Sequence, residues 1–220
     1  MASEDKDVPS YERRSVYDGL THASNPNQTH LGGNHLEGDP YTFAPKVWDY
    51  LVDRFGIKSV LDLGSGMGYA ASYFHRKGMQ VVAVEGLAEN VEHAIYPTVQ
   101  IDLTEHFVKA NVDLVHCQEV VEHIEEKYID NLLASLANGK FILMTNALPN
   151  QGGFHHVNEQ PIEYWVQQMA RYNCHVLAED TNRIRRLADQ EGARYLAKTG
   201  TLYVNKNKVT FGADPEPTQP

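Results

Sequence analysis

The sequence contains only two cysteines, Cys117 and Cys174, among its 220 residues. So few thiols exclude a disulfide framework and a zinc site built on cysteines, and we expect both side chains to be buried. No apolar run approaches the roughly 20 residues that cross a bilayer. The N-terminus also lacks the basic start and apolar core of a secretory signal. We therefore expect a cytoplasmic protein without a membrane partner.

Basic residues are also scarce, because 19 lysines and arginines face 29 aspartates and glutamates, which gives a formal net charge of -10. This balance disfavours nucleic acid as a partner, since phosphate backbones are bound by clustered cations. A basic helical stretch near the C-terminus is the local exception, and it is either an ordinary solvated face or a contact for an anionic substrate. Its members are Arg183, Arg185, Arg186, Arg194 and Lys198.

The composition is that of one globular domain with polar ends. Residues 1–15 and 213–220 are expected to be disordered tails, because they carry too few apolar side chains to order themselves. Residues 16–57 are expected to form an N-terminal cover of loop and helix, and residues 58–212 the main domain. Within the cover, the segment Thr21–Pro40 is rich in Asn, Gly and His, which predicts either a lid or a linker. Its histidines are His22, His30 and His35.

Short β-branched runs alternate with helical patterns from Lys58 onward, which is typical of a parallel sheet covered by helices on both faces. The fold class is therefore α/β. We predict strands at Ser59–Leu63, Gln80–Glu85, Thr98–Leu103, Val112–Cys117, Lys140–Thr145, Cys174–Ala178, Thr201–Val204 and Val209–Phe211. We predict helices at Ala44–Phe55, Tyr69–Lys77, Glu119–Ala137, Pro161–Tyr172 and Asp180–Lys198. The last two strands are predicted to pair as a hairpin, and so to form an antiparallel edge.

The most informative motif is a buried strand that runs into the glycine turn GSGMG, at residues 64–68, and then into a helix. Glycines let the backbone approach a nucleotide-type ligand closely. The dinucleotide fingerprint would need a third glycine where Tyr69 stands, so a dehydrogenase is disfavoured. Asp62, two residues before the turn, would repel a pyrophosphate and attract a ligand that carries an ammonium group.

Two further carboxylates end the strands that follow. Glu85 could accept hydrogen bonds from both ribose hydroxyls of an adenosine group, and Asp102 could face the adenine amino group. Either residue alone could equally be a polar strand end. Their occurrence together with the glycine turn favours a ligand site.

These motifs carry a resemblance to a known family. Through VLDLGSGMGYAASYF, VVAVEG, the strand end at Asp102 and DLVHCQEVVEHI, residues 58–204 resemble the class I S-adenosylmethionine-dependent methyltransferases. The resemblance implies a single-domain, Rossmann-like, doubly wound sheet of seven strands, mostly parallel with an antiparallel last strand. It also implies that S-adenosylmethionine is the cofactor, with Asp62 near its methionine end, Glu85 at its ribose and Asp102 at its adenine. The other residues implied around the cofactor are Gly64, Ser65, Gly66, Gly68 and Gln118.

Glu119, Glu122 and His123 stand at i, i+3 and i+4, and would share one face of the helix predicted there. Two carboxylates and an imidazole suit magnesium, manganese or zinc if another loop supplies a fourth ligand. The alternative is that acids at a helix start stabilise the helix dipole without a metal. The E-x-x-E-H segment is similar to one in magnesium-dependent small-RNA 2'-O-methyltransferases, which pair it with a later histidine, and to one in ubiquinone-pathway O-methyltransferases.

His155 and His156 are the candidate catalytic residues, in a glycine-containing loop after the fifth predicted strand. An imidazole with a pKa near 6.5 could accept the proton of an acceptor hydroxyl as the methyl group is transferred. The same two histidines are candidates for the missing metal ligand. The alternative is that each is a loop residue bonded to the backbone.

We therefore expect a methyltransferase that modifies an oxygen of a small polar acceptor, such as a sugar or a sugar-bearing metabolite. The oxygen preference depends on the histidines and the metal site, so an amine acceptor stays open. Two alternatives are an RNA 2'-O-methyltransferase with a divalent metal, and an S-adenosylmethionine-binding protein without chemistry.

Overall fold

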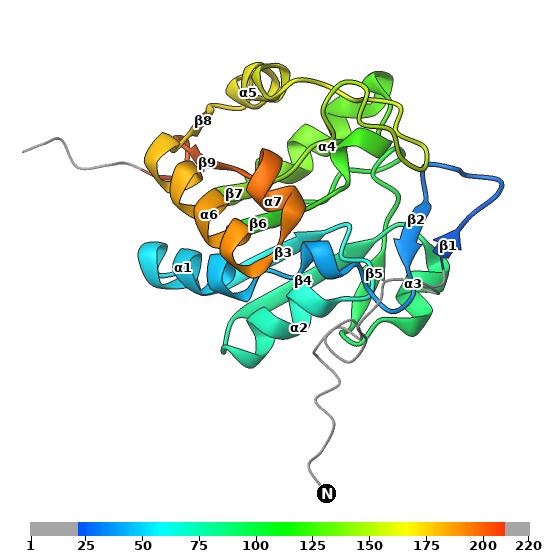
Figure 1. Ribbon diagram of the computed structural model, residues 1–220, viewed down its shortest axis with the longest axis horizontal. Coiled ribbons are helices and arrows are strands. Elements are labelled where there is room, and N and C mark those ends of the chain that lie inside the picture. The colour runs from blue at the N-terminus through cyan, green and yellow to red at the C-terminus, as the bar shows by residue number, and fades with distance from the viewer. Residues whose placement is uncertain (1–21, 210–220) are drawn as a thin grey trace, which may run out of the picture.

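The computed structural model describes residues 22–209, through which a seven-stranded sheet runs (Figure 1). Its strands are β3 (Ser59–Leu63), β4 (Gln80–Glu85), β5 (Thr98–Gln100), β6 (Val112–Cys117), β7 (Gly139–Met144), β8 (Cys174–Val176) and β9 (Thr201–Asn205). The strand order is β5-β4-β3-β6-β7-β9-β8. β9 is antiparallel to both β7 and β8, and the other neighbouring pairs are parallel. This confirms the expected α/β sheet with an antiparallel last strand.

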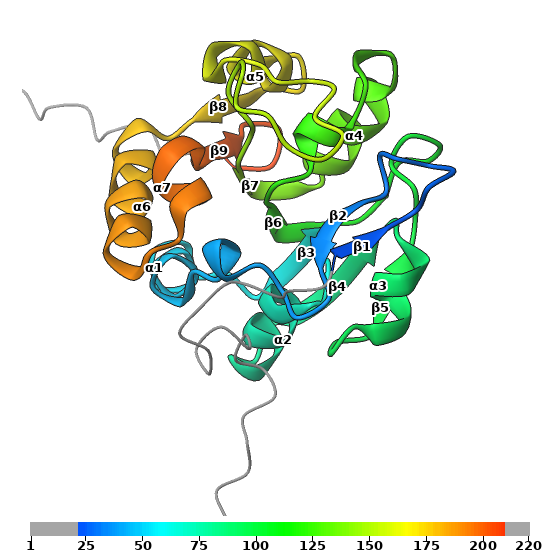
Figure 2. The ribbon, with the colours of Figure 1, turned by 45° about the vertical axis from the view of Figure 1, so that its right-hand side comes forward.

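Helices cover both faces of the sheet (Figure 2). They are α1 (Pro45–Phe55), α2 (Tyr69–Arg76), α3 (Ala88–His93), α4 (Ile129–Leu136), α5 (Ile162–Ala170), α6 (Ala178–Glu191) and α7 (Arg194–Thr199). Successive side chains of a strand point to opposite faces, so a strand covered on both sides must be apolar at nearly every position. β3 shows this directly, because Leu61 and Leu63 belong to one core and Val60 to the other.

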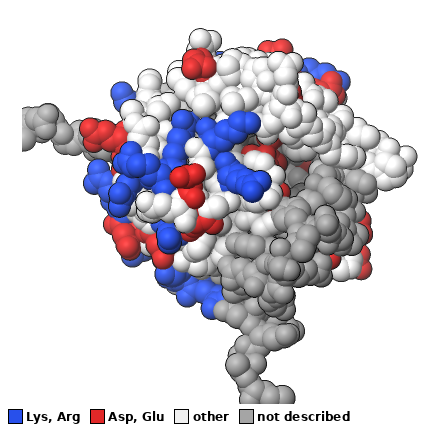
Figure 3. Space-filling model, in the orientation of Figure 1, with Lys and Arg blue, Asp and Glu red and all other residues white. Residues whose placement is uncertain are grey.

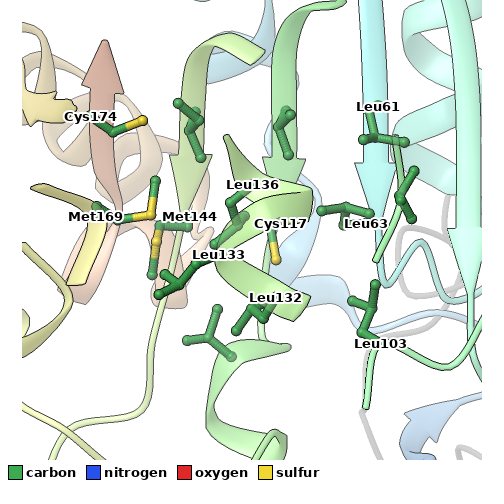
Figure 4. Close-up of a cluster of buried hydrophobic side chains, with 14 of the residues drawn as sticks. Leu61, Leu63, Leu103, Cys117, Leu132, Leu133, Leu136, Met144, Met169 and Cys174 are labelled. Carbon is green, nitrogen blue, oxygen red and sulfur yellow. The ribbon is translucent and has the colours of Figure 1, made fainter. Parts of the chain in front are cut away.

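Two hydrophobic cores hold these layers together. On one face, the leucines of α4 pack with side chains from β6, β7 and α5, namely Cys117, Met144 and Met169 (Figure 4). On the other face, α1, α2, α6 and α7 contribute Trp48, Leu51, Phe74, Ile184 and Leu196. Cys117 and Cys174 are buried free thiols, as expected. Within residues 22–209, no helix combines the length and apolar character needed to cross a membrane.

Two of the predicted helices were wrong in extent. The first 10 positions predicted as helix from Glu119 contain instead two 3-10 turns, η3 (Val121–His123) and η4 (Glu126–Tyr128), which precede α4. Glu119 itself has φ 54, a left-handed conformation that cannot belong to a right-handed helix. The helix predicted over Asp180–Lys198 is split into α6 and α7, because Gly192, with φ 78, ends α6.

The structure also contains elements that the sequence did not predict. These are α3 and an antiparallel hairpin of β1 (His22–Ser24) and β2 (Gly32–His35), which lies in the polar segment Thr21–Pro40. The predicted terminal hairpin is wrong for the part that the structure describes. The backbone N–H groups of Lys208 and Val209 turn back to the Asn205 carbonyl, and β9 pairs with β7 and β8. Residues 210 and 211 and both predicted tails lie outside the described residues.

We expect the α4 core to be sensitive to truncation. Leu133 is fully buried, so Leu133→Ala removes buried methyl groups and leaves a cavity, which should lower the free energy of unfolding by about 3 kcal/mol. Val99→Ala on the edge strand, at an exposed side chain, should change it by about 0.5 kcal/mol or less. Urea denaturation followed by circular dichroism measures both values, and equal effects would contradict this packing.

Candidate functional site

The candidate site is a cavity of about 390 Å³ at the carboxyl ends of β3, β4 and β6. β3 lies between β4 and β6 in the sheet. The chain adds β4 and β5 on one side of β3 and then β6 and β7 on the other side, so the strand order reverses at β3. Ligands of open α/β sheets bind at such a reversal. The cavity lining includes most of the predicted site residues, namely Asp62, Gly64, Ser65, Gly66, Glu85, Asp102, Gln118, Glu119, His123 and His156.

The glycine turn connects β3 to α2 and needs its glycines. Gly64, Gly66 and Gly68 all have positive φ, from 54 to 78. A Cβ at position 64 would come within 2.3 Å of Val120, so no side chain fits there without displacing the loop after β6. The N–H groups of Gly64 and Ser65 donate to the Val84 carbonyl, which fixes the turn against β4. The turn is therefore a rigid backbone surface at the floor of the cavity.

Glu85 braces this turn from the end of β4. Its carboxylate is buried and accepts hydrogen bonds from the N–H of Gly66 at 2.8 Å and of Leu87 at 2.9 Å. Burial raises the pKa of this carboxyl above its usual value, although the backbone donors act in the opposite direction. Each oxygen that accepts one N–H retains capacity for a ligand hydroxyl. The placement is compatible with the predicted ribose contact, which stays a prediction.

Asp62 forms a buried pair with a residue that the sequence analysis missed. His116 Nδ1–H donates to Asp62 Oδ1 at 2.7 Å, and the two residues are register partners on β3 and β6. Both are almost fully buried and both line the cavity. The only sequence signal was a polar residue within the apolar run of β6. The second oxygen of this cavity-lining carboxylate, Asp62 Oδ2, is buried without a hydrogen-bond partner among the described residues.

Asp102 does not stand free to meet a ligand. It accepts hydrogen bonds from His30 Nε2 at 2.8 Å, and from the N–H and Oγ1–H of Thr104. Burial acts to raise the pKa of Asp102, but these donors hold it below its usual value. His30 belongs to the polar segment, so part of the expected cover contacts the cavity. The side chains of His22 and His35 are not among those that the structure describes.

Several buried polar atoms around the cavity have no hydrogen-bond partner among the described residues. They are Trp48 Nε1, Asp62 Oδ2, Ser65 Oγ, His116 Nε2, both amide atoms of Gln118, and His123 Nδ1. Native proteins rarely leave buried polar groups unsatisfied, and each such group demands a partner. Their clustering at one cavity indicates a polar ligand with both donors and acceptors.

A second group of side chains converges beside this cavity. One ligand-type atom each of Glu122, His123 and His156 lie within 4.8 Å of one another. The two imidazole rings meet edge-on, with centroids 5.1 Å apart. The Glu122 carbonyl accepts hydrogen bonds from the N–H groups of Val157 and Asn158, both at 3.0 Å. These bonds hold the loop that carries His156 against η3. The group is assembled by this loop contact, not by the predicted helical face.

Glu119 does not belong to this group of three, but it neighbours Glu122. Its N–H donates to Thr145 Oγ1, and its Oε1 accepts the Thr145 hydroxyl, both at 2.8 Å. Burial raises the pKa of Glu119 to about 7. Burial and the neighbouring Glu119 also raise the pKa of Glu122 well above its usual value. Burial, with the nearby imidazoles, lowers the pKa of His123 to about 4, so His123 is neutral at pH 7 and able to ligate a cation.

The structure separates the two candidate catalytic histidines. His156 lines the cavity, and its Nδ1–H donates to Glu159 at 3.1 Å, which leaves Nε2 for another partner. His155 has φ 47 and lies beside His30, with ring centroids 6.4 Å apart. It is not among the residues that line the cavity. The geometry therefore favours His156 over His155 as a residue that contacts a substrate.

Comparison with known proteins gives a family match over most of the chain. A family model described as a methyltransferase domain matches residues 38–198. The ubiquinone biosynthesis O-methyltransferase of Rickettsia typhi is 31% identical over 98 residues, which make up 39% of this chain and 40% of that protein. The match thus spans well under two thirds of this relative's length.

Solved structures show the same fold. TehB from Haemophilus influenzae matches 61% of this chain and 52% of its own, with a TM-score of 0.51 at 15% identity. A magnesium protoporphyrin IX methyltransferase from Synechocystis PCC 6803 with bound SAH matches 60% of this chain and 71% of its own, with a TM-score of 0.50 at 14% identity. At these identities the likeness concerns the fold alone.

The Asp62 and His116 pair gives a stability prediction. His116→Leu leaves a buried carboxylate without its donor and should lower the free energy of unfolding by about 3 kcal/mol. The control is His106→Ala, whose side chain is largely exposed and should have little effect. Urea denaturation of both variants measures the difference. If His116→Leu were as stable as the control, the pair would not hold these strands together.

Proposed function

Because the chain belongs to the methyltransferase-domain family, we propose that it transfers a methyl group from S-adenosylmethionine to an oxygen of a small polar acceptor, such as a sugar or sugar-bearing metabolite. The observation that carries the oxygen preference is the convergence of Glu122, His123 and His156 beside the cavity. A carboxylate and two imidazoles suit the activation of a hydroxyl, by a bound cation or by direct proton removal.

The residues of the cavity fit the cofactor chemically. Asp62 Oδ2, which has no partner among the described residues, suits the ammonium of the methionine moiety. Glu85 suits the ribose hydroxyls, and the glycine turn suits close backbone contact. Asp102 would reach the adenine amino group only by sharing its oxygens between that group and its present donors, His30 and Thr104.

The side chains of Glu122, His123 and His156, beside the cavity and next to Glu119, also fit a divalent cation. His123 Nδ1 is buried without a partner, and the hydrogen bond from His156 to Glu159 fixes the orientation of that imidazole. When bound, such a cation would lower the pKa of an acceptor hydroxyl. Without it, His156 Nε2 would accept the hydroxyl proton, since Nδ1 is engaged by Glu159.

An RNA end is the second candidate acceptor, and the E-x-x-E-H segment at Glu119–His123 supports it. The net charge of -10 argues against a long phosphate backbone on the surface. A binding protein without chemistry is the weaker alternative, because it has no use for an imidazole such as His156 on the cavity wall.

The glycine turn gives a direct test of cofactor binding. Gly64→Ala should weaken S-adenosylmethionine binding by at least about tenfold, because a side chain there displaces Val120 and the turn. Gly78→Ala is the matched control, since Gly78 also has positive φ but open space around it. The strained backbone should cost both variants stability, and the overlap with Val120 should cost Gly64→Ala more. Isothermal titration calorimetry measures the two affinities, and equal values would contradict the proposed cofactor position.

The cation site is tested by manganese binding, followed by electron paramagnetic resonance. Glu122→Gln and His156→Ala should each weaken Mn²⁺ binding by at least about tenfold, since each removes one donor from the group. His155→Ala is the matched control and should retain wild-type affinity. If the wild-type protein bound no Mn²⁺, the cation would be refuted and His156 would stand as the base.

A further inference from the structure

The cavity has a basic rim on the side of α7. Arg194 and Lys198 are four residues apart on this helix, so they project from neighbouring turns of one face. Both are exposed, and neither has a carboxylate partner among the described residues. Figure 3 shows Lys and Arg side chains gathered over α6 and α7, with acidic side chains in the hollow beside them.

Each of the two cations contacts a neighbouring polar or aromatic side chain. The Arg194 guanidinium lies 4.0 Å above the ring of Tyr41, which packs edge-on against Tyr195. Lys198 Nζ donates to Gln151 Oε1 at 2.8 Å. Tyr195 and Gln151 both line the cavity. Lys198 therefore contacts the cavity wall directly, and Arg194 is linked to it through Tyr41.

The electrostatics of the site separate into two zones. The interior is lined by carboxylates, which include Asp62, Glu85 and Asp102. Such an interior suits a cationic sulfonium and repels an anion. The exposed side chains of Arg194 and Lys198 add positive charge outside this interior. A ligand with a neutral hydroxyl at one end and an anion at the other would match both zones.

We propose that Arg194 and Lys198 bind the phosphate of the methyl acceptor, which makes the acceptor class a small hydroxyl-bearing phosphate monoester such as a sugar phosphate. An arginine and a lysine together supply the forked donors and the point charge that recognise phosphate. This deepens the proposed function and rests on it. Arg185 of the same basic stretch has a structural role, since it donates to the Gly200 carbonyl and to Thr201.

The test uses the full chain saturated with S-adenosylhomocysteine and compares ribose 5-phosphate with ribose by isothermal titration calorimetry. The wild-type protein should bind ribose 5-phosphate at least about tenfold more tightly than ribose. The double variant Arg194→Ala/Lys198→Ala should lose this preference. The control is Arg183→Ala/Arg186→Ala, which removes two exposed cations from α6 and should keep it.

The affinity for S-adenosylhomocysteine, measured for each protein, distinguishes a failure of the proposed function from a failure of the phosphate proposal. If the wild-type protein did not bind S-adenosylhomocysteine, the proposed function would be refuted. Normal S-adenosylhomocysteine binding with equal affinity for the two sugars, or a preference that survives in the Arg194/Lys198 variant, would overturn the phosphate proposal alone. Binding of a short oligoribonucleotide through these residues, but not of ribose 5-phosphate, would also overturn it and would indicate an RNA end.

Discussion

The buried carboxylate of Glu85 ties together the loops on which the whole cavity depends. It accepts the N–H of Gly66 in the turn after β3 and the N–H of Leu87 in the turn after β4. Two turns that belong to neighbouring strands are thereby held as one unit. The glycine turn can then keep its left-handed backbone, α2 begins at a fixed place, and the loop after β6 packs against Gly64 through Val120. The carboxylate of Glu85 is thus a structural brace between the two turns.

The chemistry of the site follows from a gradient of charge. Buried acidic and neutral polar groups line the cavity together with histidines, and two exposed cations of α7 lie beside its wall. Carboxylates in the interior tolerate their burial only with donors close by, and Asp62 and Asp102 obtain them from His116 and His30. These two histidines thus stabilise buried negative charge in the pocket.

The sequence predicted the centre of the fold far better than its edges. β3, β4 and β6 were predicted to the residue, because strands covered on both faces are apolar at most positions. The hairpin of β1 and β2 has no such pattern. The Glu119 region misled for a physical reason, since spacing at i, i+3 and i+4 looks the same whether the backbone is α-helical or broken by a residue at φ 54. A left-handed glutamate leaves no mark in a single sequence.

The parts of the candidate site that lie in local sequence motifs could be predicted. The contacts between residues far apart in the sequence could not. The glycine turn and Glu85 lie at strand ends that the pattern located. The pair His30–Asp102 joins residues 72 positions apart, through a contact of the turn between β1 and β2 with the loop after β5. The pair Asp62–His116 joins residues 54 positions apart, and the register of β3 and β6 brings them together. Such register partners also constrain how the sequence can change over evolutionary time. A single replacement at position 62 or 116 strands a buried polar group, so drift at either position must pass through a less stable intermediate unless both change together. The two positions should therefore covary, and a homologue that lacks the histidine should carry a compensating donor for the aspartate.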